Sequence, residues 1–214
     1  MNELKIKVCG MRTPENISGV AFAFPDYLGF IFYPKSKRFV GFEPLSDVLS
    51  IIPDSVKKVG VFVTETSEKV SETVQNWNLD VVQLHGNESS EYCQQIQDLG
   101  ITVFKAFSVD DQFDFEILNA YSGVCDYFLF DTKSQLPGGT GQKFNWQLLE
   151  NYKGDVPFFL SGGIGPNDLE ALLQFRHPLL FGIDINSGFE ISPGLKDVEK
   201  VKNFISGIRS KSVI

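Results

Sequence analysis

The sequence predicts an α/β protein in which residues 1–214 form one domain, a single (β/α)8 TIM barrel. Eight short apolar runs alternate with segments of helical pattern, as in a parallel sheet covered by helices. Most of these runs are apolar almost throughout, which strands buried on both faces require. At about 25 residues per unit the chain has the length of a closed eightfold barrel. A doubly wound open sheet is the alternative, and the missing glycine-rich dinucleotide-binding turn after the first strand weakens it.

The expected strands are rich in β-branched and aromatic residues, which suit a pleated sheet. In the first strand, apolar residues alternate with two lysines up to Cys9, where Gly10 lets the chain turn into a loop. We expect the eight strands at Leu4–Cys9, Tyr27–Phe32, Lys57–Val63, Asp80–Leu84, Thr102–Phe107, Tyr127–Phe130, Pro157–Leu160 and Leu180–Ile183.

The helical segments between the strands are expected partly from their start signals. Pro14 and Pro166 follow Thr13 and Gly165, and proline is favoured in the first turn of a helix. The segment near residues 111–121 has no distinct periodicity. The expected segments are Pro14–Phe24, Pro44–Ile51, Ser67–Asn76, Ser89–Leu99, Asp111–Tyr121, Asn145–Tyr152, Pro166–Phe175 and Lys196–Ile208.

The composition is that of an ordinary globular protein, with 43% hydrophobic and 21% charged residues. A net charge of -8 without a basic patch argues against a nucleic-acid partner. The three cysteines, Cys9, Cys93 and Cys125, show no CxxC or Cys/His spacing, so we expect neither disulfides nor a metal site. Because there is no signal-peptide core and no apolar run of bilayer length, we expect a cytoplasmic protein without membrane contact.

In such a barrel the active site lies at the carboxyl ends of the strands. The glycine-rich turn Ser161–Gly165 follows the seventh strand, and Asn186, Ser187 and Gly188 follow the eighth. Glycines let backbone N–H groups point inward, so the two turns together suit a phosphate group. Alternatively, the glycines only form tight turns.

Two groups at these ends suit proton transfer. Cys9 ends the first strand with one side of its thiol open, although an isolated cysteine is more often a buried apolar residue. Asp131 follows the apolar sixth strand, where its protonated form is favoured, although it also suits a helix cap. A thiol and a carboxyl across the mouth imply that a proton moves within a phosphorylated small molecule, without metal or redox cofactor.

Two further polar groups lie near this mouth. Arg38 is suited to bidentate binding of a carboxylate, although a surface charge is the simpler reading of a single arginine. His85, after the fourth strand, is either a structural residue or one that shifts the protonation of the thiol.

Motifs spread in order over nearly the whole chain closely resemble those of phosphoribosylanthranilate isomerase. Each motif is weak alone, and the set is highly specific. The matching segments are Val8–Met11, Leu28–Arg38, Val59–Val63, Val82–Gly86, Phe130–Thr132, Gly138–Gly141, Leu160–Gly163, Ser187–Gly188 and Pro193–Asp197.

The resemblance implies an Amadori rearrangement in tryptophan biosynthesis that needs no cofactor. N-(5-phosphoribosyl)anthranilate is converted to 1-(2-carboxyphenylamino)-1-deoxyribulose 5-phosphate. By family analogy Asp131 is the general acid, Cys9 is the general base and Arg38 holds the anthranilate carboxylate. The resemblance also implies the phosphate ligands and pocket residues, which are Gly162, Gly163, Asn186 and Ser187 for the phosphate, with His85 and Asp184 in the substrate pocket.

The chain departs from the family at Asn186 and Phe189, where Ser and Val are commoner, which leaves open whether the Asn186 side chain contacts phosphate. A monomer or weak homodimer is expected. Two rival functions remain: another phosphosugar barrel, such as indole-glycerol-phosphate synthase or a pentose-phosphate epimerase, and a barrel that only binds a phosphorylated ligand. Indole-glycerol-phosphate synthase would require a catalytic lysine at a strand end, and a pentose-phosphate epimerase would require metal-binding histidines. Neither is evident.

Overall fold

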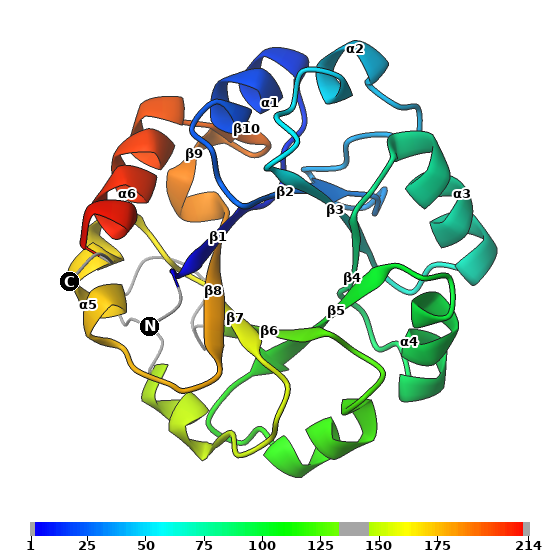
Figure 1. Cartoon of the computed structure of the whole chain (residues 1–214), viewed down its shortest axis with the longest axis vertical. Helices are drawn as coiled ribbons and strands as arrows, with labels where there is room; N and C mark the ends of the chain where they lie inside the picture. Colours follow the sequence, from blue (N-terminus) through cyan, green and yellow to red (C-terminus); the bar gives the residue numbers. More distant parts are fainter. Residues whose placement is uncertain (1–2, 133–145, 212–214) are drawn as a thin grey trace.

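A computed structural model describes residues 3–132 and 146–211. Its eight parallel strands form a closed barrel in chain order (Figure 1). The barrel closes where β1 pairs with β8, from Lys5 opposite Gly182 to Val8 opposite Ile185. This closure confirms the expected barrel and excludes the open sheet. Among the described residues, no helix has the length and apolar character needed to cross a membrane.

All eight expected strands are present, and their ends lie within two residues of the predicted ones. β5, β6 and β8 are longer than expected at their carboxyl ends. Asp131 and Asp184 therefore lie inside strands, paired with Ser108 and Lys7 of the neighbouring strands. The strands are β1 (Lys5–Val8), β2 (Tyr27–Ile31), β3 (Lys57–Phe62), β4 (Val81–Leu84), β5 (Thr102–Val109), β6 (Tyr127–Thr132), β7 (Phe158–Ser161) and β8 (Leu180–Ile185).

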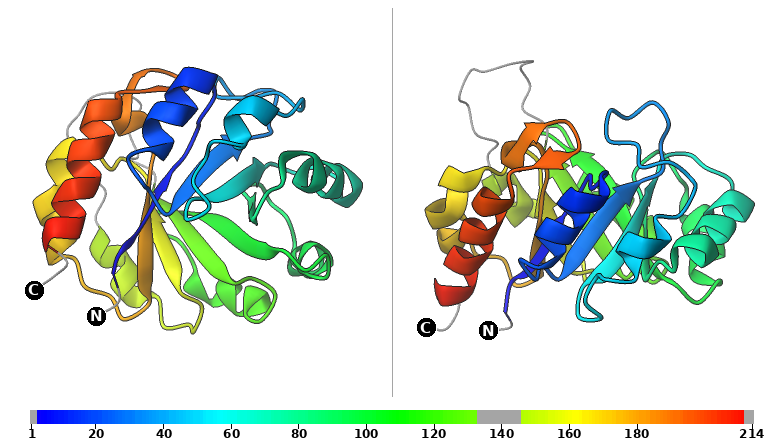
Figure 2. Two further views of the ribbon diagram at one scale, coloured as in Figure 1. Left: turned by 45° about the horizontal axis from the view of Figure 1, so that its top comes forward. Right: turned by 90° about the horizontal axis from the view of Figure 1, so that it is seen from above.

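Helices surround the barrel, as Figures 1 and 2 show. Several are shorter than expected, and α1, for example, ends at Ala21 and not at Phe24. The α-helices are α1 (Pro14–Ala21), α2 (Ser46–Leu49), α3 (Ser67–Trp77), α4 (Ser90–Gln97), α5 (Leu169–Gln174) and α6 (Val198–Lys211). The described residues also contain four 3-10 helices, namely η1 (Phe115–Tyr121), η2 (Trp146–Asn151), η3 (Pro166–Asp168) and η4 (Ser187–Phe189).

The indistinct segment near residues 111–121 folds as the 3-10 helix η1 and not as an α-helix. Its core-facing residues Phe115, Leu118 and Tyr121 recur every three positions, which matches the repeat of a 3-10 helix. The ring of Phe115 packs against Phe130, and that of Tyr121 against Phe107. Packing on the strands therefore decides the local conformation where helical periodicity is weak.

The interior of the barrel is filled and is not a pore. A small apolar cluster occupies the half nearest the amino ends of the strands, with Phe104 packed between Tyr27 and Phe159 at ring-centroid distances of 5.6 and 5.0 Å. Side chains alternate between the two faces of a strand, so residues two positions further along also point inward. The inward positions that follow this cluster hold polar groups, including Gln83 and Asp131.

The region after β8 contains a hairpin that the sequence did not predict, formed by β9 (Glu190–Ser192) and β10 (Leu195–Lys196). We expected a helix to begin at Lys196, and this was wrong. The backbone N–H and C=O of Lys196 are both hydrogen-bonded by the buried Asn16 side chain of α1, which holds residue 196 in the hairpin until α6 begins at Val198. Figure 2 shows the hairpin beside α1.

Candidate active site

The sequence-predicted residues gather at the carboxyl end of the barrel. Cys9 continues the pairing of β1, because its N–H donates to the carbonyl of Ile185 at 2.9 Å. Asp184 interacts electrostatically with groups on both sides of the mouth, namely Cys9 on one side and His85 and Asp131 on the other. The Gly138–Gly141 motif lies outside the described residues.

Cys9 lies in a tight, buried environment. A Cβ at Gly29, on the adjacent strand β2, would lie 2.8 Å from the Cys9 sulfur, so only glycine leaves room for the thiol. Gly10 has a φ of 77° and passes between the side chains of Arg38 and Asn186. Burial raises the pKa of the Cys9 thiol, and the neighbouring Lys7 ammonium opposes this rise.

Lys7 lies fully buried inside the barrel, two residues before Cys9 on the same face of β1. Its Nζ is 2.9 Å from Oδ1 of Asp184, and its charge also interacts with the Cys9 thiol. Burial by itself lowers the pKa of Lys7, but attraction to Asp184 and Cys9 outweighs this and raises it. The sequence analysis missed Lys7, although a lysine at an inward position of a barrel strand is a signal for a buried ion pair.

His85 and Asp131 face each other across the mouth, with Nε2 of His85 3.5 Å from Oδ2 of Asp131. Behind them the Gln83 amide nitrogen lies 2.8 Å from Nδ1 of His85. With this amide as donor, Nδ1 is the acceptor and Nε2 carries the proton that faces Asp131. The carbonyl oxygen of Gln83 is buried and has no hydrogen-bond partner within the described part of the chain.

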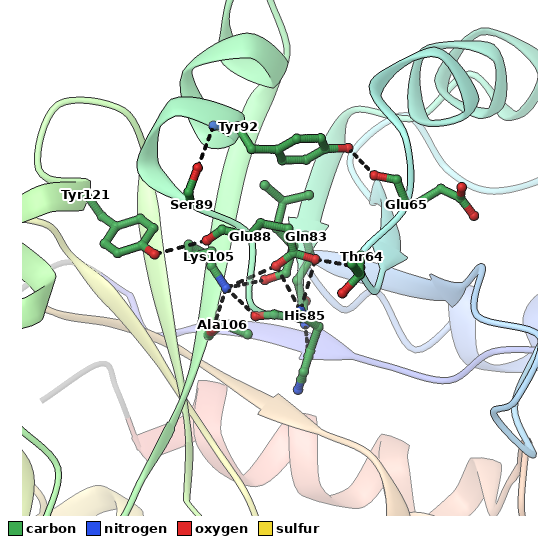
Figure 3. A network of polar contacts seen from close by, with 12 residues as sticks. Thr64, Glu65, Gln83, His85, Glu88, Ser89, Tyr92, Lys105, Ala106 and Tyr121 are labelled. Carbon is green, nitrogen blue, oxygen red and sulfur yellow. Dashed lines mark hydrogen bonds and ion pairs between the residues drawn. The ribbon is translucent and has the colours of Figure 1, made fainter.

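The loop that carries His85 is fixed from behind by the buried ion pair of Glu88 and Lys105, whose Oε2 and Nζ are 3.2 Å apart (Figure 3). Lys105 also donates to the carbonyl of Gly86 at 2.8 Å. The Glu88 carboxylate accepts from the N–H groups of Thr64 and Gly86. These hydrogen bonds connect the loops after β3 and β4, and the His85 ring points toward the mouth of the barrel.

On the opposite side of the mouth, Arg38 is held by Glu190 of the hairpin. Nε and Nη2 of Arg38 donate to the two carboxylate oxygens at 2.7 and 2.6 Å. Lys196, which is also buried, donates to Glu190 and to Oδ1 of Asn186. Burial raises the pKa of Glu190, but hydrogen bonds from Arg38, Lys196 and the Gly194 N–H outweigh this and lower it to about 2. Periodicity alone did not indicate these hairpin partners.

The turns after β7 and β8 touch each other, as a shared phosphate site requires. Gly162 and Gly163 have φ values of 92° and 66°, which favour glycine. A Cβ at Gly188 would lie 3.0 Å from the Cα of Gly165, so the second turn packs directly on the first. The residues described in the structure contain no group of three or more His, Cys, Asp or Glu side chains arranged for a metal ion.

Residues 6–207 match the family model described as N-(5'-phosphoribosyl)anthranilate (PRA) isomerase. Proteins named N-(5'-phosphoribosyl)anthranilate isomerase from Parabacteroides distasonis and Phocaeicola vulgatus are 51% and 46% identical to this chain. The alignments cover 97% and 96% of this chain and 95% and 98% of those proteins.

Solved structures agree with this assignment. The phosphoribosyl anthranilate isomerase of Thermotoga maritima superposes with a TM-score of 0.85 at 34% identity, over 97% of this chain and 99% of that one. A phosphoribosyl anthranilate isomerase in complex with reduced 1-(o-carboxyphenylamino)-1-deoxyribulose 5-phosphate gives a TM-score of 0.83 at 32% identity, with the same coverage. The resemblance noted in the sequence is confirmed, and the chain belongs to the N-(5'-phosphoribosyl)anthranilate isomerase family of (β/α)8 barrel enzymes.

Proposed function

We propose that this protein converts N-(5'-phosphoribosyl)anthranilate to 1-(2-carboxyphenylamino)-1-deoxyribulose 5-phosphate in tryptophan biosynthesis, with its own side chains as acid and base. The observation that carries this proposal is the convergence of Cys9 and Asp131 on one barrel mouth, where Asp184 interacts with both. The relative that was solved with a reduced form of the product supports the choice of substrate.

In the first step Asp131 acts as the general acid. The lone pair of the substrate nitrogen forms a C=N bond to C1 of the ribose while the bond from C1 to the ring oxygen breaks. The ring oxygen takes the proton of Asp131, which leaves an open-chain Schiff base and an ionised carboxylate. His85 lies beside this carboxyl group and orients it toward the mouth.

In the second step the Cys9 thiolate removes the proton from C2. The electron pair of the C–H bond moves into the C1–C2 bond, and the C=N electrons return to nitrogen, which gives an enolamine. The Schiff base makes this proton acidic enough for a thiolate, because the positive nitrogen accepts the developing charge. Tautomerisation of the enolamine gives the ketone, so that no atom is gained or lost overall.

Two anchors hold the substrate during these steps. The bidentate pair with Glu190 uses two donors of Arg38 and leaves the other edge of the guanidinium for the anthranilate carboxylate. The phosphate is bound at the touching turns after β7 and β8, by Gly162, Gly163, Asn186 and Ser187. Since Oδ1 of Asn186 accepts a bond from Lys196, its amide N–H₂ remains as the donor that can reach a phosphate.

We further propose that residues 1–214 form a single domain and that the substrate is a phosphorylated small molecule. The protein is then cytoplasmic, is a monomer or weak homodimer, and has no nucleic-acid or membrane partner. Size-exclusion chromatography with light scattering over a range of concentrations tests the oligomeric state.

The decay of substrate fluorescence tests the chemistry. We expect Cys9→Ser and Asp131→Asn to lose turnover while they still bind a reduced product analogue, because each removes a proton-transfer group and leaves both anchors. Cys93→Ser, which changes a thiol on the buried face of α4, is the control and should keep the wild-type rate. Near-full turnover by both site variants would show instead that the barrel uses other groups, and an absence of turnover in the wild type would show that it only binds its ligand.

A further inference from the structure

We propose that Lys7 is a positioning residue for the general base, and that its buried ammonium holds the negative charge of the Cys9 thiolate. This inference rests on the proposed function, in which the thiolate of Cys9 removes the C2 proton. It assigns a role to a lysine inside the barrel that has no place in the acid, base and anchor scheme.

The geometry of β1 places the two groups together. Lys7 and Cys9 occupy successive inward positions, and the Lys7 side chain has no solvent exposure. The ammonium donates to Asp184 Oδ1 at 2.9 Å and attracts the negative charge of a Cys9 thiolate. An ammonium is kept in such a site only where partners replace its lost hydration, and here the Asp184 carboxylate does so while the proposed base occupies the next inward position.

The charges around the sulfur favour a thiolate. The groups that act on Cys9 come from β1, β8, β10 and the loop after β2, and are Lys7, Asp184, Lys196 and Arg38. Glu190 of β9 binds Arg38 and Lys196, and His85 and Asp131 lie beyond Asp184. Of the groups that act on the sulfur, Lys7, Lys196 and Arg38 are positive and Asp184 is negative, so together they favour a thiolate.

Lys7 is the cation that lowers the pKa of the Cys9 thiol most. Lys196 directs its ammonium to two oxygen atoms, those of Asn186 and Glu190, at 2.7 and 2.8 Å. Arg38 is committed to Glu190 through two bonds. Burial raises the pKa of the Cys9 thiol, and among the opposing influences the Lys7 ammonium is the largest. Without Lys7 the thiolate would be harder to form in this buried position.

The chain offers a matched control on the same strand. Lys5 is two residues before Lys7, also carries an ammonium and also pairs with a carboxylate, Asp26, at 2.9 Å. Lys5 is partly exposed and is not among the charges that act most strongly on Cys9. A change at Lys5 therefore removes one ion pair of β1 and leaves the surroundings of the thiol intact.

The experiment measures the titration of the Cys9 thiol in a Cys93→Ser/Cys125→Ser background, by thiolate absorbance and by the rate of iodoacetamide alkylation against pH. Lys7→Gln keeps a hydrogen-bond donor for Asp184 but no charge. We expect it to raise the thiol pKa by roughly one to three units, and the pH dependence of kcat to shift to higher pH with it. Lys7→Arg should restore most of the shift, and Lys5→Gln should cause none.

Asp184→Asn gives a second and opposite test that does not depend on the folding of Lys7→Gln. Because the Asp184 carboxylate repels a thiolate and competes for Lys7, its removal should lower the thiol pKa. An unchanged thiol pKa in either variant overturns the inference. If Lys7 were merely structural, neither Lys7→Gln nor Asp184→Asn would change the pKa of the Cys9 thiol. Failure of the proposed function is seen separately, as full turnover by Cys9→Ser.

Discussion

The Arg38 guanidinium and the Glu190 carboxylate form a bidentate pair, with donor–acceptor distances of 2.7 and 2.6 Å. The pair joins the loop after β2 to the hairpin after β8, two segments 152 residues apart in the sequence. Figure 2 shows both segments at the same end of the barrel. Arg38 is therefore not a solvated surface charge, since its side chain is held in one orientation at the rim of the proposed site.

If Arg38 holds the anthranilate carboxylate, Arg38→Ala should weaken substrate binding by roughly 1.5–3 kcal/mol, the typical contribution of a charge-assisted hydrogen bond. The increase should appear in KM and leave kcat nearly constant, because the reacting atoms are not touched. Steady-state fluorescence kinetics measure both constants. Lys37→Ala removes the neighbouring exposed charge and should leave KM unchanged. An unaltered KM in Arg38→Ala would remove this residue from the carboxylate site.

Glu190→Gln tests whether the orientation of Arg38 matters. The amide keeps one acceptor oxygen but loses the charge and the bidentate geometry, so the guanidinium should become mobile. We expect KM to rise by the equivalent of about 1 kcal/mol. This effect should vanish when the same change is made in the Arg38→Ala variant, because Glu190 acts through Arg38. Equal effects in both backgrounds would instead indicate a direct or purely structural role.

The lowered pKa of Glu190 predicts a loss of stability in acid. Its folded-state pKa of about 2 lies below the ordinary value of 4.5, so the ionised carboxylate stabilises the folded chain above pH 4.5. This contribution should disappear as the pH falls from 4.5 toward about 2. Urea unfolding of the wild type and Glu190→Gln over this range measures it. Their free energies of unfolding should converge at the acid end, and a constant difference would contradict the assignment.

Gly29→Ala should impair the proposed base without replacing Cys9 itself. The added methyl group would lie 2.8 Å from the Cys9 sulfur and 3.1 Å from its Cα, so the thiol must move. A small misplacement of a reacting group reduces the rate by on the order of 100-fold. We expect kcat to fall far more than KM changes, because both anchors remain. A wild-type kcat in a folded Gly29→Ala protein would show that the thiol position is not critical.

Loss of one partner of the Glu88–Lys105 pair should be strongly destabilising, because both side chains are almost fully buried. Lys105→Met leaves the Glu88 carboxylate buried without its cation and should cost about 3–5 kcal/mol in the free energy of unfolding. Lys57→Met breaks an exposed pair with Asp80 and should cost about 0–1 kcal/mol. Urea denaturation compares the two variants. Similar losses would show that burial of the Glu88–Lys105 pair has no energetic consequence.

The sequence by itself determined the strands and most of the residues at the barrel mouth. An apolar run of β-branched and aromatic residues becomes a buried strand wherever it pairs, so the positions of the eight strands follow from local pattern. The carboxyl ends of parallel strands meet at one edge, which placed Cys9 and Asp131 at the mouth before any contact was known. Weak periodicity near residues 111–121 left the 3-10 form of η1 undetermined.

Only the tertiary structure decided which charged side chains pair with one another. Lys7 and Asp184 are 177 residues apart, and they meet because β1 closes the barrel against β8. Arg38 meets Glu190, 152 residues away, because the hairpin in which Asn16 holds Lys196 lies beside the loop after β2. A salt bridge depends on distances of a few ångströms and on burial, and neither exists until the barrel has closed. The local sequence pattern therefore predicts where the reacting groups lie, whereas closure of the barrel determines which charged side chains surround them.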